Sequence, residues 1–125
     1  MFLRITLILQ TIALFAAPVT AGLLLSVPSR QPLHSAAAYT VFAVAVLQLV
    51  ASVVAWRPGG GSPKPIMHAA GFLVLVSAQV ALGIAHVTTL HVPLGVLLFT
   101  GSVLQLSRVW TPRSSERVSR TPSSV

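Results

Sequence analysis

The chain contains no cysteine and almost no acidic side chains. Without cysteine it can form no disulfide, hold no metal through thiolates and perform no thiol chemistry. Its single acidic residue is Glu116, so the long apolar segments hold no carboxylate that could act as a base or carry protons through a membrane. Zinc catalysis, which usually needs three ligands and a base, and proton-driven transport are therefore disfavoured.

Charge of either sign is also scarce. Charged residues make up 7% and hydrophobic residues 54% of the 125-residue chain, whereas roughly a quarter of a soluble domain is charged. Lipid must therefore be the solvent for most of the chain, which predicts an integral membrane protein. The net charge of +7 does not indicate a nucleic-acid partner, because the basic residues are spread along the chain and form no folded basic domain.

Four apolar stretches are long enough to cross a hydrocarbon core of roughly 30 Å, which takes about 20 helical residues. Between proline- and glycine-rich separators, which end helices, they lie near residues 5–27, 34–56, 66–89 and 92–110. No strand-like alternation is present, so a barrel is not expected. The sequence thus predicts an all-α bundle of four transmembrane helices over residues 1–110, followed by a Ser-rich, basic, disordered tail over residues 111–125.

The basic residues predict the orientation of this bundle. Of the eight lysines and arginines, only Arg30 falls on one side of a four-crossing arrangement, and all the others fall on the opposite side. By the positive-inside rule both termini and the middle connection face the cytoplasm, which predicts a multi-pass protein of the plasma (inner) membrane. Trp56 and Trp110 end the second and fourth stretches at the same face, as interfacial anchors do.

An alternative interpretation of the first stretch is a cleaved secretory signal. A basic N-terminus, an apolar run and the small residues up to Ala21 resemble such a signal, and cleavage there would leave three crossings. We expect the stretch to be retained, because it has a counterpart in the third stretch. Residues 12–20 align with residues 80–88 and share five identities, and with a one-residue gap Gln10 also meets Gln79.

The second and fourth stretches correspond more closely. HSAAAYTVFAVAVLQL (34–49) aligns without gaps with HVPLGVLLFTGSVLQL (91–106), sharing the first His, a Phe, a Val and the final Leu-Gln-Leu. The His and Gln identities are the strongest evidence for the repeat, because both residues are rare and costly inside hydrophobic segments. The chain is therefore interpreted as two tandem helical hairpins, related by a pseudo-twofold axis along the membrane normal.

This symmetry predicts that His34 and His91 share one depth near the outer face and point at each other across the bundle. Ala38 and Gly95, one helical turn further on, leave room beside each imidazole or serve ordinary close helix packing. Four of the five glutamines form a second set of costly side chains. We expect them all in the cytoplasmic half, where interhelical hydrogen bonds among them act as structural glue rather than as a substrate site: Gln10, Gln48, Gln79 and Gln105.

A paired histidine site favours a bound metal or haem. His34 and His91 lie near helix N-termini, where the positive dipole end disfavours imidazolium, and neutral imidazole is the form that ligates iron. Haem held between histidines of two helices needs neither a carboxylate nor a cysteine. His86 is an alternative ligand at the same end, and His68 lies near the inner face. Three residues near this end are candidates to receive haem propionates: Arg30, Thr88 and Thr89. The alternative for Arg30 is a solvated loop charge.

The layout resembles one four-helix half of haem A synthase, a membrane enzyme built from two such bundles. In that family each half carries haem-ligating histidines on its second and fourth helices near the outer face, and His34 and His91 match those positions. QVALGIAHVTTLHVPLGVLLF (Gln79–Phe99) is similar to the family's hairpin between helices 3 and 4. The likeness covers roughly residues 9–108 through short motifs. The chain looks most like the small, stand-alone four-helix membrane proteins that share this single-half plan.

Three departures separate the chain from the enzyme. The catalytic half of the enzyme has a glutamate three residues before the helix-2 histidine and an arginine directly after it, and here these places hold Gln31 and Ser35. The outer-loop cysteine pair of the family is absent as well. The resemblance therefore implies haem binding but not oxidation of a haem methyl group, and a catalytic role is left open with no catalytic residue assigned.

The sequence thus leads to one hypothesis and two alternatives. The hypothesis is a membrane protein that ligates one haem b through His34 and His91 and serves electron transfer, haem handling or sensing. The first alternative is a haem-free structural or assembly subunit of a respiratory or other membrane complex. The second is a small-molecule or quinone site in the outer half of the bundle that uses His86. Redox partner and oligomeric state are not assigned by any of these.

Overall fold

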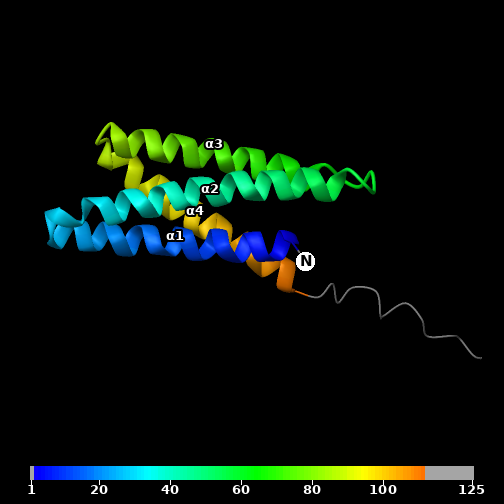
Figure 1. Cartoon of the computed structure of the whole chain (residues 1–125), viewed down its shortest axis with the longest axis horizontal. Helices are drawn as coiled ribbons and strands as arrows, with labels where there is room; N and C mark the ends of the chain where they lie inside the picture. Colours follow the sequence, from blue (N-terminus) through cyan, green and yellow to red (C-terminus); the bar gives the residue numbers. More distant parts are fainter. Residues whose placement is uncertain (1, 112–125) are drawn as a thin grey trace, which may run out of the picture.

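The computed structural model describes residues 2–111 and consists of four long helices joined by short connections (Figure 1). The expected tail falls almost wholly on residues 112–125, outside the described part. The elements are α1 (Phe2–Ser26), the 3-10 helix η1 (Pro28–Arg30), α2 (Gln31–Trp56), α3 (Lys64–Ile84) and α4 (Thr88–Trp110). All four α-helices are long and apolar enough to cross a membrane, and residues 2–111 contain no strand. The predicted all-α, four-helix fold of a multi-pass membrane protein is confirmed.

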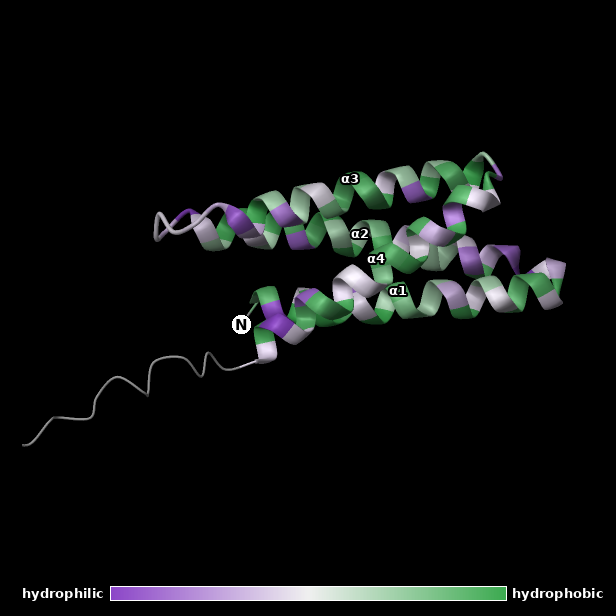
Figure 2. Cartoon of the chain, turned by 180° about the vertical axis from the view of Figure 1, so that it is seen from behind, coloured by the Kyte–Doolittle hydropathy of each residue, from purple (hydrophilic) through white to green (hydrophobic). Residues whose placement is uncertain are grey.

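The outer surface of the bundle is apolar, as lipid requires. Figure 2 shows hydrophobic residues along all four helices, and strongly hydrophilic residues mainly in the connections and at helix ends, with a few within the helices. Large aliphatic and aromatic side chains such as Ile12, Val74 and Leu97 are exposed on this surface. The buried core is small by comparison and combines aliphatic with polar side chains, among them Val76 and Gln10. This distribution suits a bundle whose solvent is hydrocarbon.

The helices occupy the corners of a four-membered ring in chain order. Close backbone contacts join α1 to α2, α2 to α3, α3 to α4 and α4 to α1, whereas α2 and α4 share none. The helices α2 and α4 are therefore diagonal. The end of the bundle that carries Phe2, residues 57–63 and Trp110 is called the terminal end below (Figure 1). The opposite end, which carries η1 and residues 85–87, is called the histidine end.

The third helix is shorter than the sequence predicts. It ends at Ile84 instead of residue 89, because residues 85–87 form a Schellman turn. The Val87 N–H donates to the Leu82 carbonyl at 3.0 Å, and the His86 N–H donates to the Gly83 carbonyl at 3.2 Å. His86 takes the left-handed position of this motif with φ of 56°, which glycine or asparagine usually occupies. The sequence pattern hides the helix end because neither of those residues is present.

The early end of α3 fixes the register of α4. Helix α4 begins at Thr88, so His91 is its fourth residue, just as His34 is the fourth residue of α2. The predicted correspondence between the second and fourth helices is therefore matched in the structure. The predicted residue-by-residue alignment of the first with the third helix is not matched where these helices end. Thr20 lies six residues before the end of α1, whereas its aligned partner Thr88 begins the next helix.

Candidate functional site

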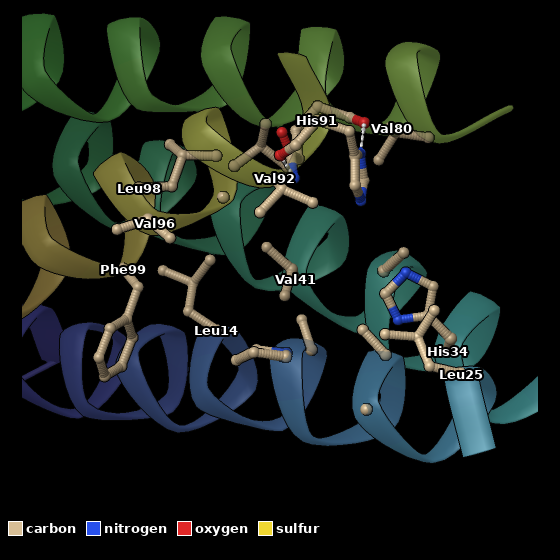
Figure 3. A pocket seen from close by; sticks show the side chains of 18 residues that line it. Leu14, Leu25, His34, Val41, Val80, His91, Val92, Val96, Leu98 and Phe99 are labelled. Atoms are coloured by element: carbon tan, nitrogen blue, oxygen red, sulfur yellow. Dashed lines mark hydrogen bonds between the residues drawn. The ribbon is translucent and has the colours of Figure 1, made fainter. Parts of the chain in front are cut away.

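A cavity of about 490 Å³ lies inside the bundle toward the histidine end (Figure 3). Its volume falls within the roughly 300–1,000 Å³ typical of small-molecule sites. All four α-helices contribute to its wall, and the only polar residues on that wall are His34, Gln79 and His91. The remaining lining residues are aliphatic, aromatic, proline or glycine: Leu14, Ala17, Pro18, Ala21, Gly22, Leu25, Ala38, Val41, Val76, Val80, Val92, Gly95, Val96, Leu98 and Phe99.

His34 and His91 face each other across this cavity. They come from the diagonal helices α2 and α4, and their ring centroids are 6.1 Å apart with ring planes at 78°. Both side chains are half-buried. Figure 3 shows one ring nitrogen of each imidazole on the side that faces the other ring. The structure thus brings together the two residues that the sequence singled out.

The ring of His91 is held by a reciprocal pair of hydrogen bonds with Gln79 of α3. His91 Nδ1 lies 3.0 Å from the Gln79 carbonyl oxygen, and Gln79 Nε2 donates to the His91 carbonyl oxygen at 2.8 Å. Because a carbonyl oxygen can only accept, His91 must carry its proton on Nδ1. The neutral ring then keeps its lone pair on Nε2, which is the nitrogen directed toward His34 (Figure 3).

The ring of His34 is held by Thr20 of α1. His34 Nδ1 lies 3.3 Å from Thr20 Oγ1. The Thr20 hydroxyl also lies within hydrogen-bond distance of the backbone carbonyls of Ala16 and Ala17, at 3.0 and 2.9 Å. When its proton is donated to those carbonyls, the Thr20 oxygen accepts from His34 Nδ1, and the lone pair of His34 is left on Nε2. The Nε2 atoms of both rings face the same apolar space (Figure 3), and no side chain of the described part donates to either.

Two glycines make room for this arrangement. A Cβ atom on Gly83 would lie 3.1 Å from Cε1 of His91, and one on Gly95 would lie 2.9 Å from Nε2 of Gln79. Gly95 therefore admits the Gln79 amide, which differs from the predicted role of leaving room beside an imidazole. Gly83 has that role, and Ala38 forms part of the cavity wall. Sequence reasoning did not assign Gln79, Gly83 and Thr20 to the site, although the Gln-x-x-x-Gly spacing of one helical turn was a usable signal.

The four glutamines do not share one half of the bundle, so that prediction is wrong. Gln79 lies five residues before the end of α3 at the histidine end, whereas Gln10, Gln48 and Gln105 lie in the half nearer the terminal end. With the predicted bounds 66–89 Gln79 lies close to the middle of the stretch, and because α3 ends at Ile84 it lies clearly in the half nearer the histidine end. Gln79 consequently belongs to the site rather than to a separate polar layer.

Hydroxyl groups rather than other glutamines are the partners of the buried amides. Gln10 Nε2 donates to Ser102 Oγ at 3.4 Å, and Ser102 Oγ lies 2.8 Å from Thr11 Oγ1. On the other side of α1, Thr6 Oγ1 donates to Gln48 Oε1. These contacts join α1 to α4 and α1 to α2, respectively. The expected hydrogen bonds between helices are present, but they join glutamines to hydroxyl groups and not to one another.

The other candidate residues lie away from the cavity. His86 is exposed in the turn after α3, and His68 is exposed near the terminal end with Nδ1 2.7 Å from the Lys64 carbonyl oxygen. Arg30 is exposed in η1, four residues before His34, and is not part of the cavity wall. Residues 2–111 contain no group of three or more His, Cys, Asp or Glu side chains suited to a metal ion. His86 therefore does not join the pair as a third ligand.

Comparison with known protein families, curated proteins and solved structures found no match. What the protein does must therefore be inferred from the chemistry of the cavity and of its two histidines.

Proposed function

We propose that this protein binds one haem b between His34 and His91 in the membrane. The observation that carries the proposal is the opposed pair of imidazoles, each held at Nδ1 and each with Nε2 directed into the cavity. Two acceptors that face each other in an apolar space repel, and a metal ion between them would convert that repulsion into two ligand bonds. Each Nδ1 atom has a hydrogen-bond partner, the Gln79 backbone carbonyl for His91 and the Thr20 hydroxyl for His34, and such partners orient metal-ligating histidines.

The spacing of the rings fits this role. Imidazole nitrogens that ligate a metal from opposite sides at about 2.0–2.1 Å lie about 4 Å apart, which puts the ring centres roughly 6 Å apart. The observed separation of the ring centroids is 6.1 Å. The 78° between the ring planes does not conflict with it, because rotation about the metal–nitrogen axis changes no distance. The donor set also suits iron in haem, since it consists of two imidazoles without a carboxylate.

The cavity fits a large, flat, apolar ligand. Its wall is apolar except at His34, Gln79 and His91, and small residues such as Ala17, Ala21 and Gly22 keep it open on the α1 side. Arg30 is the only lysine or arginine of the described part at the histidine end, and it would balance the charge of haem propionates. The other described basic residues lie at the terminal end.

Bound haem would supply one-electron redox chemistry. The contribution of the chain is to hold two neutral imidazoles at a fixed separation, to exclude water with an apolar wall and to keep each ring in one tautomer. The described helices offer no carboxylate near the cavity, and Gln31 is exposed at the start of α2. The proposal is therefore electron transfer, haem handling or sensing, and it assigns no catalytic residue.

The proposal includes an orientation in the plasma (inner) membrane. The described basic residues other than Arg30 lie at the terminal end: Arg4, Arg57, Lys64 and Arg108. The positive-inside rule then places this end in the cytoplasm and the histidine end near the outer face. Fusion of a reporter to the terminal connection at residues 57–63 should give cytoplasmic activity, and periplasmic or extracellular activity would reverse the assignment.

A difference spectrum tests the haem proposal. The protein is purified in detergent from haem-supplemented cells, and a reduced-minus-oxidised spectrum is recorded. We expect a sharp α-band and Soret band that are lost in His34→Ala and in His91→Ala but kept in His68→Ala, which removes an imidazole outside the cavity. Colourless wild-type protein would refute the proposal and favour a haem-free structural or assembly subunit.

A further inference from the structure

A second cavity of about 450 Å³ lies between α3 and α4 near the terminal end. It is a groove that opens toward the outside of the bundle, and it shares no lining residue with the cavity of the histidines. Its wall combines polar side chains, His68, Gln105 and Arg108, with apolar ones such as Phe72 and Leu75. A groove of mixed polarity near the end of a membrane bundle suits a molecule that has both a polar and an apolar part.

Two glycines keep this groove open. A Cβ atom added to Gly71 of α3 or to Gly101 of α4 would meet nothing within 4 Å. Glycines at helix interfaces in membranes normally allow two backbones to approach closely, and here neither glycine serves that purpose. Gly71 lies seven residues from Lys64, and Gly101 lies seven residues from Arg108, so both are about 10 Å deeper in the bundle than these cations.

The mouth of the groove is positively charged. Arg108 lies in the last turn of α4, two residues before the interfacial Trp110. The single acidic residue of the chain, Glu116, lies outside the described part, so no carboxylate of residues 2–111 neutralises Arg108. Gln105, one turn earlier on the same helix, adds an amide donor, and His68 faces the same groove from α3. This set of donors matches the oxygens of a phosphate group at headgroup depth.

We propose that the groove between α3 and α4 binds one anionic phospholipid. Its phosphodiester contacts Arg108 and Gln105 at the mouth, and one acyl chain lies over Gly71 and Gly101 against the apolar wall. Anionic headgroups are favoured over zwitterionic ones because the described residues that line the groove include Arg108 and no carboxylate that could bind a choline or ethanolamine group. This site is independent of haem and of the histidine cavity.

Native mass spectrometry of the full-length protein from mixed micelles tests the proposal. The probes are phosphatidylglycerol and phosphatidylcholine with equal acyl chains. Wild type should retain one phosphatidylglycerol in preference to phosphatidylcholine. Arg108→Gln should lower that retention about tenfold, because the phosphodiester loses a charge-assisted hydrogen bond to the guanidinium. Gly101→Leu should lower it as well, by filling the groove at a position where the added side chain has open space.

Arg57→Gln is the matched control, because it removes the same charge at the same end outside the groove. It should leave the retained phosphatidylglycerol unchanged. Equal loss in Arg57→Gln and Arg108→Gln would overturn the proposal in favour of diffuse surface attraction. Unchanged retention in Gly101→Leu, or displacement of the lipid by millimolar inorganic phosphate, would show that the groove does not hold the acyl chain and would overturn it too.

Discussion

Replacement of Gly95 by alanine should weaken the contact that holds His91 in place. The added Cβ would lie 2.9 Å from Nε2 and 3.8 Å from Cδ of Gln79, and real Cβ contacts are not that short. The amide must therefore move, and it loses the 2.8 Å hydrogen bond to the His91 carbonyl oxygen. The Oε1 atom of Gln79 is buried and has no hydrogen-bond partner within the described residues, so no second hydrogen bond of the amide group opposes this movement.

The expected change in the free energy of unfolding is the sum of two opposed contributions. An interhelical hydrogen bond in a membrane contributes about 0.6 kcal/mol on average and up to about 1.7 kcal/mol, and strain of the displaced side chain adds to the loss. Alanine in a helix interior is in turn about 1 kcal/mol more favourable than glycine. Gly22→Ala isolates the second term, because Gly22 lines the same cavity and has open space for a Cβ. The free energy of unfolding of Gly95→Ala should therefore lie about 1–2 kcal/mol below that of Gly22→Ala.

The assay is equilibrium unfolding of both variants in detergent by increasing mole fractions of dodecyl sulfate, followed by circular dichroism. Haem retention after purification provides a second readout, and it should fall in Gly95→Ala relative to the wild type. If both variants changed the unfolding free energy by the same amount, Gly95 would not be the residue that makes room for the Gln79 amide. The proposed role of Gly95 in the hydrogen bond between Gln79 and His91 would then be refuted.

Three further predictions concern the surrounding hydrogen bonds and the turn. His86→Gly should raise the free energy of unfolding by about 1 kcal/mol, because glycine adopts the left-handed φ without steric cost. His86→Ala should not raise it. Equal effects of the two substitutions would contradict the left-handed conformation of residue 86. Ser102→Ala should lower it by about 1–2 kcal/mol, because both Gln10 and Thr11 lose a partner, and Ser107→Ala, at an exposed site, should change it by less than about 0.5 kcal/mol. Thr20→Val keeps the shape of the side chain but removes the hydrogen-bond partner of His34 Nδ1. The apparent Kd for haem, measured by spectral titration, should therefore rise about tenfold. An unchanged Kd would mean that Thr20 does not orient the ring.

The pairing of His34 with His91 could be predicted from the sequence because two costly residue types recur at the same spacing in the second and fourth helices. Polar side chains in lipid are retained only where they have partners, so their positions carry more information than those of the surrounding aliphatic residues. The four crossings follow from the same physics, since the length of an apolar run is set by the thickness of the hydrocarbon core. These parts of the fold depend on composition and spacing alone.

The rest of the site depends on local backbone geometry that the sequence does not display. The end of α3 is set by His86 in the left-handed conformation. No glycine or asparagine marks this position, so the sequence does not reveal where the helix ends. That end moves α4 by several residues and brings Gln79 into contact with His91. The rotation of each helix about its axis then decides that Gly95 faces Gln79 and that Thr20 faces His34. Such rotations follow from side-chain packing across the bundle and not from periodicity in one helix.

The coordination of a bound iron tests the central claim most directly. Electron paramagnetic resonance of the oxidised, detergent-solubilised protein reports how many strong axial ligands the haem iron has. Two imidazoles from His34 and His91 predict one low-spin, six-coordinate haem per chain in the wild type and a high-spin signal or loss of haem in either single alanine variant. A wild-type protein without haem, or one whose low-spin signal persists in both His34→Ala and His91→Ala, would contradict the account.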